Sequence, residues 1–174
     1  PTAEKLRRLL HLGQTLQSHA LHFFHLASPD LLFGFGSDAR RRNIVGVAAA
    51  DPNLALKGIG LRKYGQEVIR HISGKRVHGT AALPGGMNKA LATEDRDTLL
   101  KDIETIIADS RIALQVARDL YLQDLDTSHS FAAITSSFLS LSGPGGALDL
   151  YHGGLRARSA SGEVLLEDVD YRTY

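Results

Sequence analysis

The sequence contains no cysteine, and this absence has the widest consequences. Disulfides, iron–sulfur clusters, thiolate zinc sites and cysteine nucleophiles all require that side chain. None of these can form from residues of this chain, which is 174 residues long. The sequence therefore excludes every function that depends on a thiolate of its own.

The chain also lacks a charge imbalance and a long apolar run. Lys and Arg number 20 against 19 Asp and Glu, and a net charge of +1 does not favour nucleic acid or an anionic membrane as a partner. The longest apolar run, Ile44–Ala50, is far shorter than the roughly 20 residues of a membrane helix. We therefore expect a soluble protein that binds neither nucleic acid nor membrane.

What is present suits a compact, mainly α protein. Hydrophobic residues make up 43% of the chain and charged residues 22%, which is enough apolar material for a core. The length fits one domain over residues 1–174. The patterns below predict a helical body over residues 1–126 and mostly β structure over residues 127–174, ending in a small antiparallel meander.

The first predicted helix covers Thr2–Leu26. Thr2 is a suitable N-cap, and apolar residues follow at spacings of three and four, which is typical of one buried helix face. Ser28-Pro29 is expected to end this helix, because the residue before proline avoids the α conformation.

Three shorter helices are expected next, over Asp38–Ala49, Pro52–Leu56 and Leu61–Ile72. Ser37 is the predicted cap of the first of them, and Asp51 caps the second. Gly58 and Gly60 are expected to separate the second helix from the third, and Gly74 to end the third. The segment 75–92 is predicted to be irregular.

The longest predicted helix covers Glu94–Gln123, capped by Thr93. Leu100, Ile107 and Leu114 lie seven residues apart along it. About thirty residues form a rod of roughly 45 Å, which is long for a small domain. We therefore expect part of its apolar face to pack on something outside this chain.

The C-terminal part shows short apolar runs separated by turn sequences. The predicted strands are Ala147–Tyr151, Leu155–Ser159 and Glu163–Glu167. His152-Gly153-Gly154 and Ala160-Ser161-Gly162 are the tight turns between them. The segment 130–141 remains ambiguous between helix and strand.

Three histidines are the first candidates for chemistry. His19, His22 and His25 lie three residues apart on the first predicted helix. Two of them could chelate a metal from one helix, whereas three could not easily do so. The interleaved Phe23 and Phe24 favour the alternative, a packed face with hydrogen-bonded imidazoles.

Glycine-rich stretches and charge clusters give weaker signals. Pro84-Gly85-Gly86 and Gly143-Pro144-Gly145-Gly146 lack the phosphate-loop pattern, so both are predicted to be turns. No nucleophile elbow of the serine hydrolases is present. The block Arg40–Arg42 indicates a solvated face or a salt-bridged interface.

The segment Gly13–Asp30 resembles the central helix of [NiFe]-hydrogenase large subunits, most of all the soluble NAD-reducing and bidirectional group. The run Ser18–Leu26, which is rich in histidine, leucine and phenylalanine, is the most specific part of the match. Further matching segments are Arg42-Asn43, Ala50–Pro52, Leu61–Glu67, Gly74–His78, Ala82–Met87, Gly146–Tyr151, Leu155-Arg156 and Asp170-Tyr171. The resemblance extends over nearly the whole chain.

The resemblance identifies residues that would pack around the metal site without binding it. These candidates are Ser18, His19, His22, His25, Asp30, His78, Pro84, Gly85 and Gly86. In this family two cysteine pairs hold the nickel–iron centre, and neither pair is present in this chain. Gly79 also follows His78 where the family usually has proline. We therefore assign no catalytic residue, no metal ligand and no cofactor to the chain itself.

The resemblance implies a cytoplasmic enzyme that oxidises H₂ and passes electrons toward NAD. This chain would be a scaffold in the middle of its large subunit, inactive alone. Its partners would be a small subunit with iron–sulfur clusters and an NAD-linked diaphorase module, and the apolar face of the long helix also permits self-association. One alternative is a cysteine-free paralogue that serves as a structural subunit. Another is a metal binder that uses His19, His22 and His78.

Overall fold

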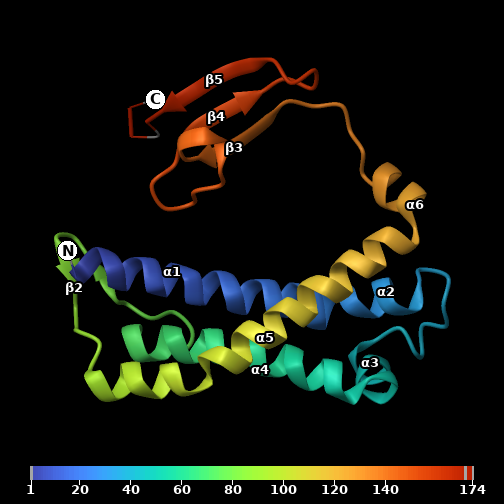
Figure 1. Cartoon of the computed structure of the whole chain (residues 1–174), viewed down its shortest axis with the longest axis horizontal. Coiled ribbons are helices and arrows are strands. Elements are labelled where there is room, and N and C mark those ends of the chain that lie inside the picture. Colours follow the sequence, from blue (N-terminus) through green and yellow to red (C-terminus); the bar gives the residue numbers. More distant parts are fainter. Residues whose placement is uncertain (1, 171, 174) are drawn as a thin grey trace. The chain divides into compact units, whose positions relative to one another are not determined.

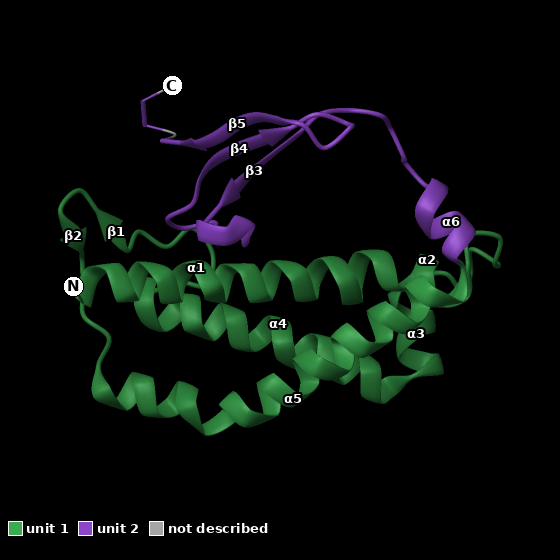
Figure 2. Ribbon diagram, turned by 45° about the horizontal axis from the view of Figure 1, so that its top comes forward, with its two compact units in different colours: residues 1–124 green, residues 125–174 purple. Residues whose placement is uncertain are grey.

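The computed structural model describes residues 2–170 and 172–173, and the chain divides into two compact units. The first unit ends at Asp124 and the second begins at Leu125 (Figure 2). This boundary lies two residues before the predicted change from helical to mostly β structure at residue 126. Tyr171, which the resemblance includes, lies outside the described residues.

The described part of unit 1 consists of helices, one short hairpin and the loops that connect them. Its helical segments are α1 (Thr2–Ala20), the π-helix η1 (Leu21–Ala27), α2 (Ser28–Phe33), α3 (Ile44–Ala50), α4 (Pro52–Ser73) and α5 (Thr93–Gln123). α4 lies between α1 and α5 and packs along both of them (Figure 1). The hairpin joins β1 (Ala82–Leu83) to β2 (Gly86–Met87), within the segment predicted to be irregular.

The predicted helix over Thr2–Leu26 is correct at its start but wrong at its end. α1 runs into the π-helix η1, and Ser28-Pro29 begins α2 instead of stopping the chain of helices. The Ser28 backbone N–H donates to the Phe23 carbonyl, and its hydroxyl donates to the Phe24 carbonyl at 2.6 Å. The wider π-turn thus accommodates Pro29, which has no N–H to donate.

α3 begins later than the predicted Asp38, and Ser37 is not its cap. Asn43 is the N-cap, and its side-chain oxygen accepts a hydrogen bond from the Gly46 N–H at 3.0 Å. The three arginines at 40–42 precede the helix in a turn. Positive charge is unfavourable at a helix N-terminus, which explains why the helix starts only after them.

α4 is one continuous helix, so the predicted break at Gly58 and Gly60 is wrong. A Cβ on Gly58 would lie 2.4 Å from Cγ of Phe24, and one on Gly65 would lie 2.7 Å from Cβ of Gln17. Both glycines therefore allow close approach of α4 to η1 and α1. A Cβ on Gly60 would meet nothing within 4 Å, so packing does not explain that residue.

Both ends of α4 agree with the sequence. The Asp51 carboxylate accepts a hydrogen bond from the Leu54 N–H at 2.9 Å, and Pro52 occupies the first helical position. Gly74 ends the helix with φ of 81°, the left-handed conformation that glycine adopts without strain.

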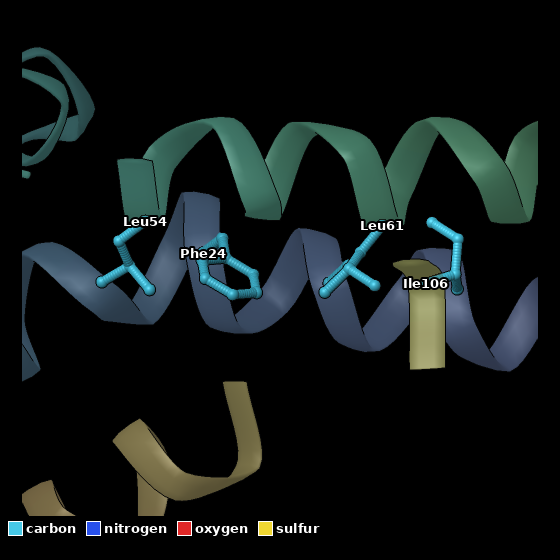
Figure 3. Packing of buried hydrophobic residues seen from close by; sticks show 5 residues of the cluster. Phe24, Leu54, Leu61 and Ile106 are labelled. Carbon is cyan, nitrogen blue, oxygen red and sulfur yellow. The ribbon is translucent and has the colours of Figure 1, made fainter. Parts of the chain in front are cut away.

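The core of unit 1 consists of two clusters along α4. The first joins the end of α1, η1, α4 and α5 and contains Ala20, Phe24, Leu54, Leu61 and Ile106 (Figure 3). The second joins α4 and the start of α5 and contains Val68, Ile72, Ala81 and Leu99. Both clusters depend on α4, which is therefore the central element of the unit.

α5 confirms the longest predicted helix, although Ala92 and not Thr93 is in the cap position and no side chain caps it. Of its 31 residues, only Leu99 and Ile106 are buried. Leu100, Ile107 and Leu114 are 55%, 37% and 72% exposed, which confirms the expected apolar surface on this rod. Within residues 2–170 and 172–173, no helix combines the length and apolar character that crossing a membrane requires.

Unit 2 contains the short helix α6 (Leu125–Ser130), the 3₁₀ turn η2 (Pro144–Gly146) and one antiparallel sheet. The sheet order is β3-β4-β5, formed by Phe138–Ser142, Gly154–Arg158 and Val164–Val169. The predicted meander is thus confirmed, but Ala147–Tyr151 is not one of its strands. Instead the ambiguous 130–141 segment supplies most of β3, and Leu148 only forms an isolated bridge to Ser142.

Candidate functional site

The candidate residues of the first predicted helix lie on three consecutive elements. Ser18 and His19 are in the last turn of α1, His22 and His25 are in η1, and Asp30 is in α2. π-Helical turns are rare in proteins and frequently occur at functional sites. The segment with the most specific family resemblance therefore contains the π-helical part of the helical body.

The three histidines do not converge. His19 Nδ1–H donates to the Thr15 carbonyl at 2.9 Å, and His19 and His22 both line one apolar hollow. His25 does not line it, and its buried Nδ1 has no hydrogen-bond partner. Among the described residues, no group of three or more His, Cys, Asp or Glu side chains is arranged to hold a metal ion.

That hollow belongs to a long apolar groove between α1 and α5, with α4 as its floor. Two adjoining hollows of about 570 and 520 Å³ form it, and they share Leu16, Ser110 and Leu114. We call it the α1–α5 groove. Its lining residues are Leu9, Leu12, Gly13, Leu16, Ser18, His19, Ala20, His22, Phe23, Phe24, Leu61, Tyr64, Val68, Ile103, Ile106, Ile107, Ser110, Arg111, Ala113, Leu114 and Ala117.

Pro84, Gly85 and Gly86 form the turn of the β1–β2 hairpin, which agrees with the prediction of a turn. Gly85 has φ of 84°, so it uses the left-handed conformation open to glycine. Arg7 of α1 donates to the Gly86 carbonyl at 3.1 Å. The hairpin is thus attached to the first turns of α1, away from the histidines of η1.

His78 lies in the segment after α4 and adopts φ of 53°, which is strained for a residue with a side chain. The next residue, Gly79, has no room for a side chain, because a Cβ there would lie 2.0 Å from the Ser73 hydroxyl oxygen. That hydroxyl donates to the Ile69 and Lys75 carbonyls at 2.7 and 2.9 Å. Packing against Ser73 therefore explains why this chain has glycine after His78.

Two of the three arginines at 40–42 form ion pairs, and the Arg40 side chain is also 90% exposed, so the block shows features of both predicted possibilities. Arg42 pairs with Asp30 at 3.3 Å, which links the turn before α3 to α2. Arg40 pairs with Asp38 at 2.8 Å, and Arg41 lies over the ring of Phe33, 5.2 Å from its centroid. Asp30 therefore holds a chain turn in place.

A network around one buried histidine was not among the sequence candidates. His71 on α4 is 8% exposed, and its Nδ1 lies 2.7 Å from the Asp95 carboxylate at the start of α5. Its Nε2 lies 2.9 Å from an Arg70 nitrogen. A guanidinium can only donate, so Nε2 accepts and Nδ1–H donates to Asp95. This arrangement fastens α5 to α4.

Glu67 extends the same network by one helical turn. Its carboxylate accepts hydrogen bonds from Arg70 at 2.7 Å and from Arg76. Burial raises the pKa of Glu67, but these bonds and charges outweigh burial and hold the pKa below its ordinary value. The Glu67–Arg70–His71 spacing was a local signal in the sequence, whereas Asp95, 24 residues after His71, was not.

In unit 2, the segments with family resemblance form turns and strand pairs. The Asp149 carboxylate accepts hydrogen bonds from the Tyr151 and His152 N–H groups at 3.0 and 2.9 Å. Arg156 of β4 pairs with Glu167 of β5. Hydrogen bonds from Arg172 lower the pKa of Asp170 to about 2. These contacts account for the segments structurally and bring no reactive group together.

The residues of this chain do not fit a nickel–iron centre. Such a centre is a site for soft thiolate ligands, and the sequence has none. The buried His71 is already occupied on both ring nitrogens, and His25 is the only histidine of the described residues with a buried unpartnered nitrogen. The ligands of any such centre must therefore come from polypeptide other than these residues.

No protein-family model matches the chain. It is 36% identical to the NAD-reducing hydrogenase HoxS subunit beta of Cupriavidus necator, over 100% of this chain and 37% of that protein. It is 42% identical to a subunit of the vhu F420-non-reducing hydrogenase of Methanococcus voltae, over 80% of this chain and 33% of that one. The chain's homologues are hydrogenase subunits.

A comparison with solved structures shows that the chain also has the fold of a hydrogenase subunit. The chain superposes on a crystal structure of an NAD⁺-reducing [NiFe]-hydrogenase in the H₂-reduced state with a TM-score of 0.92 and 44% identity. The match covers 98% of this chain and 38% of the hydrogenase chain. The chain thus spans about a third of the length of these three proteins.

Proposed function

We propose that this chain is the central scaffold of the large subunit of a cytoplasmic [NiFe] hydrogenase that oxidises H₂ and passes electrons toward NAD. The match to an NAD⁺-reducing [NiFe]-hydrogenase over 98% of the chain is the observation that supports this most strongly. The F420-non-reducing relatives share the hydrogenase character, so the electron acceptor is the more specific part of the proposal.

In this proposal the 174 residues supply shape and not chemistry. This chain has no cysteine that could supply a thiolate ligand to the metal centre. The candidates Ser18, His19 and His22 line an apolar groove. We therefore assign them to packing around the active centre of the complete subunit. A small subunit with iron–sulfur clusters and an NAD-linked module would be its partners.

A segment exchange tests this function. The matched 180-residue span of the Cupriavidus necator HoxS subunit beta is replaced by this chain, and H₂-dependent NAD reduction is measured in the assembled complex. We expect assembly and measurable reduction. As a matched pair, the same chimaera with Leu61→Glu in the α4 core should fail to assemble, whereas the chimaera with Val45→Glu, at a residue of α3 that is 73% exposed, should still assemble.

Two results would contradict the proposal. H₂ oxidation by the 174-residue chain alone would show that the scaffold assignment is wrong. A chimaera that assembles fully but never reduces NAD would favour the alternative, a cysteine-free structural subunit of an electron-transfer complex. The assembly measurement separates that outcome from simple misfolding.

A further inference from the structure

We infer that the α1–α5 groove is a docking site for an amphipathic helix with acidic flanks, supplied by polypeptide outside these 174 residues. The dimensions of the groove are the first argument. Its α5 side extends from Ile103 to Ala117, which at the α-helical rise is about 21 Å. A helix of about four turns has this length.

The composition of the groove is the second argument. Leu12 of α1 and Leu114 of α5 both line the groove and are 60% and 72% exposed. Buried Leu61 and Val68 of α4 form the floor. Contiguous apolar surface of this kind usually marks an interaction site. Helix-in-groove recognition requires an apolar floor between two walls, which α4, α1 and α5 supply here.

The charged side chains of the groove indicate which residues should flank the apolar stripe of the partner helix. Among the described residues that line the groove, none is aspartate or glutamate. The ionisable nitrogen groups there are Arg111, His19 and His22. Acidic side chains beside the apolar stripe of the partner would meet these groups favourably, whereas lysines would meet like charge.

The source of the helix follows from the length of the relatives. The matched hydrogenase chain is more than twice as long as this one, since only 38% of it is covered. A helix from the remaining polypeptide of such a subunit is therefore the occupant we assign. This assignment of source rests on the proposed function, whereas the binding of an acidic amphipathic helix does not.

The experiment uses the full 174-residue chain and two labelled peptides of about 15 residues. Both peptides have the same leucine stripe; one has glutamate flanks and the other lysine flanks. Binding is measured by fluorescence anisotropy. We expect the glutamate peptide to bind, the lysine peptide to bind at least about tenfold more weakly, and Leu114→Glu to abolish binding.

Controls keep the test independent of folding and of hydrogenase activity. Leu56→Glu changes a similarly exposed leucine of α4 that does not line the groove, and it should bind the peptide normally. Arg111→Glu should reverse the preference between the two peptides. Circular dichroism of each variant confirms that the helices persist.

Three results would overturn the inference. Equal binding of both peptides would show that the groove does not prefer acidic flanks. Absence of binding by either peptide would show that the groove does not bind an amphipathic helix. If the chain instead dimerises in sedimentation and Leu114→Glu makes it monomeric, a second copy is the occupant. None of these results depends on H₂ turnover, so failure here is distinct from failure of the proposed function.

Discussion

α4 and α5 are neighbouring helices of one bundle, yet they differ strongly in how many of their residues are buried. α4 has 22 residues and eight of them are buried, whereas α5 has 31 residues and two buried. Both helices have apolar residues at helical spacing. The difference shows that a periodic apolar stripe predicts a helix, but not whether the same chain covers that stripe.

The largest expected effect compares the same substitution on the two helices. Leu61→Ala on α4, 2% exposed, should lower the free energy of unfolding by about 2–5 kcal/mol, because it leaves a cavity. Leu114→Ala on α5, 72% exposed, should change it by less than about 0.5 kcal/mol. Urea unfolding measures both. Equal losses would mean that the groove is already covered within this chain.

Within α4, two glycines should respond in opposite directions. Gly58→Ala forces a methyl group against Phe24 and should destabilise the fold by about 1–3 kcal/mol. Gly60→Ala adds a methyl group in open space and should stabilise it by about 0.5–1 kcal/mol through helix propensity. Thermal unfolding of the two variants measures this, and a gain from Gly58→Ala would disprove the close approach of α4 to η1.

The polar network at the end of α4 should give a pH-dependent effect. The pKa of Glu67 is lowered in the folded state from its ordinary value of 4.5, so its stabilisation is present above that value and disappears as the pH falls through the lowered pKa. Glu67→Gln should cost about 1–3 kcal/mol at neutral pH. Urea unfolding should show the difference from wild type shrinking in acid, and a pH-independent difference would contradict the ionic role.

The smallest expected effect concerns the ion pair that joins α4 to α5. Lys57 Nζ lies 2.5 Å from the Asp109 carboxylate, and both side chains are partly exposed. Lys57→Met keeps the apolar stem and should cost about 1 kcal/mol or less, with the difference reduced at high salt. A salt-independent loss in urea unfolding would show that packing of the stem, and not charge, is what matters.

The sequence predicted the parts of the fold that depend on neighbours within a few residues. Asp51-Pro52 starts a helix and Gly74 ends one as predicted, although both bound the single helix α4 and not two helices. The heptad-spaced Leu100 and Ile107 lie on one helix, as predicted. The predicted start of α3 was wrong, because Asn43 is a better local cap than Ser37 after an unfavourable arginine block. The cap that forms is itself a local signal, an asparagine directly before an apolar run.

The sequence identified the candidate residues, but it did not show which of them lie next to one another in the folded chain. His19 and His22 line the α1–α5 groove, whereas His25 does not. Both neighbouring pairs of these histidines have the same three-residue spacing, so the sequence alone did not distinguish His25. The His71–Asp95 contact was not predictable, since it joins residues that only the packing of α4 on α5 brings together.

The amino-acid sequence by itself determined that this chain has no thiolate chemistry of its own and that its body is helical, because composition and local periodicity are properties of the chain alone. Only the tertiary structure decided that Gly58 continues a helix and that η1 has a wider turn. It also decided that α5 leaves a groove open over α4. Each of these depends on which surface meets which, and that information is distributed over residues far apart in the sequence.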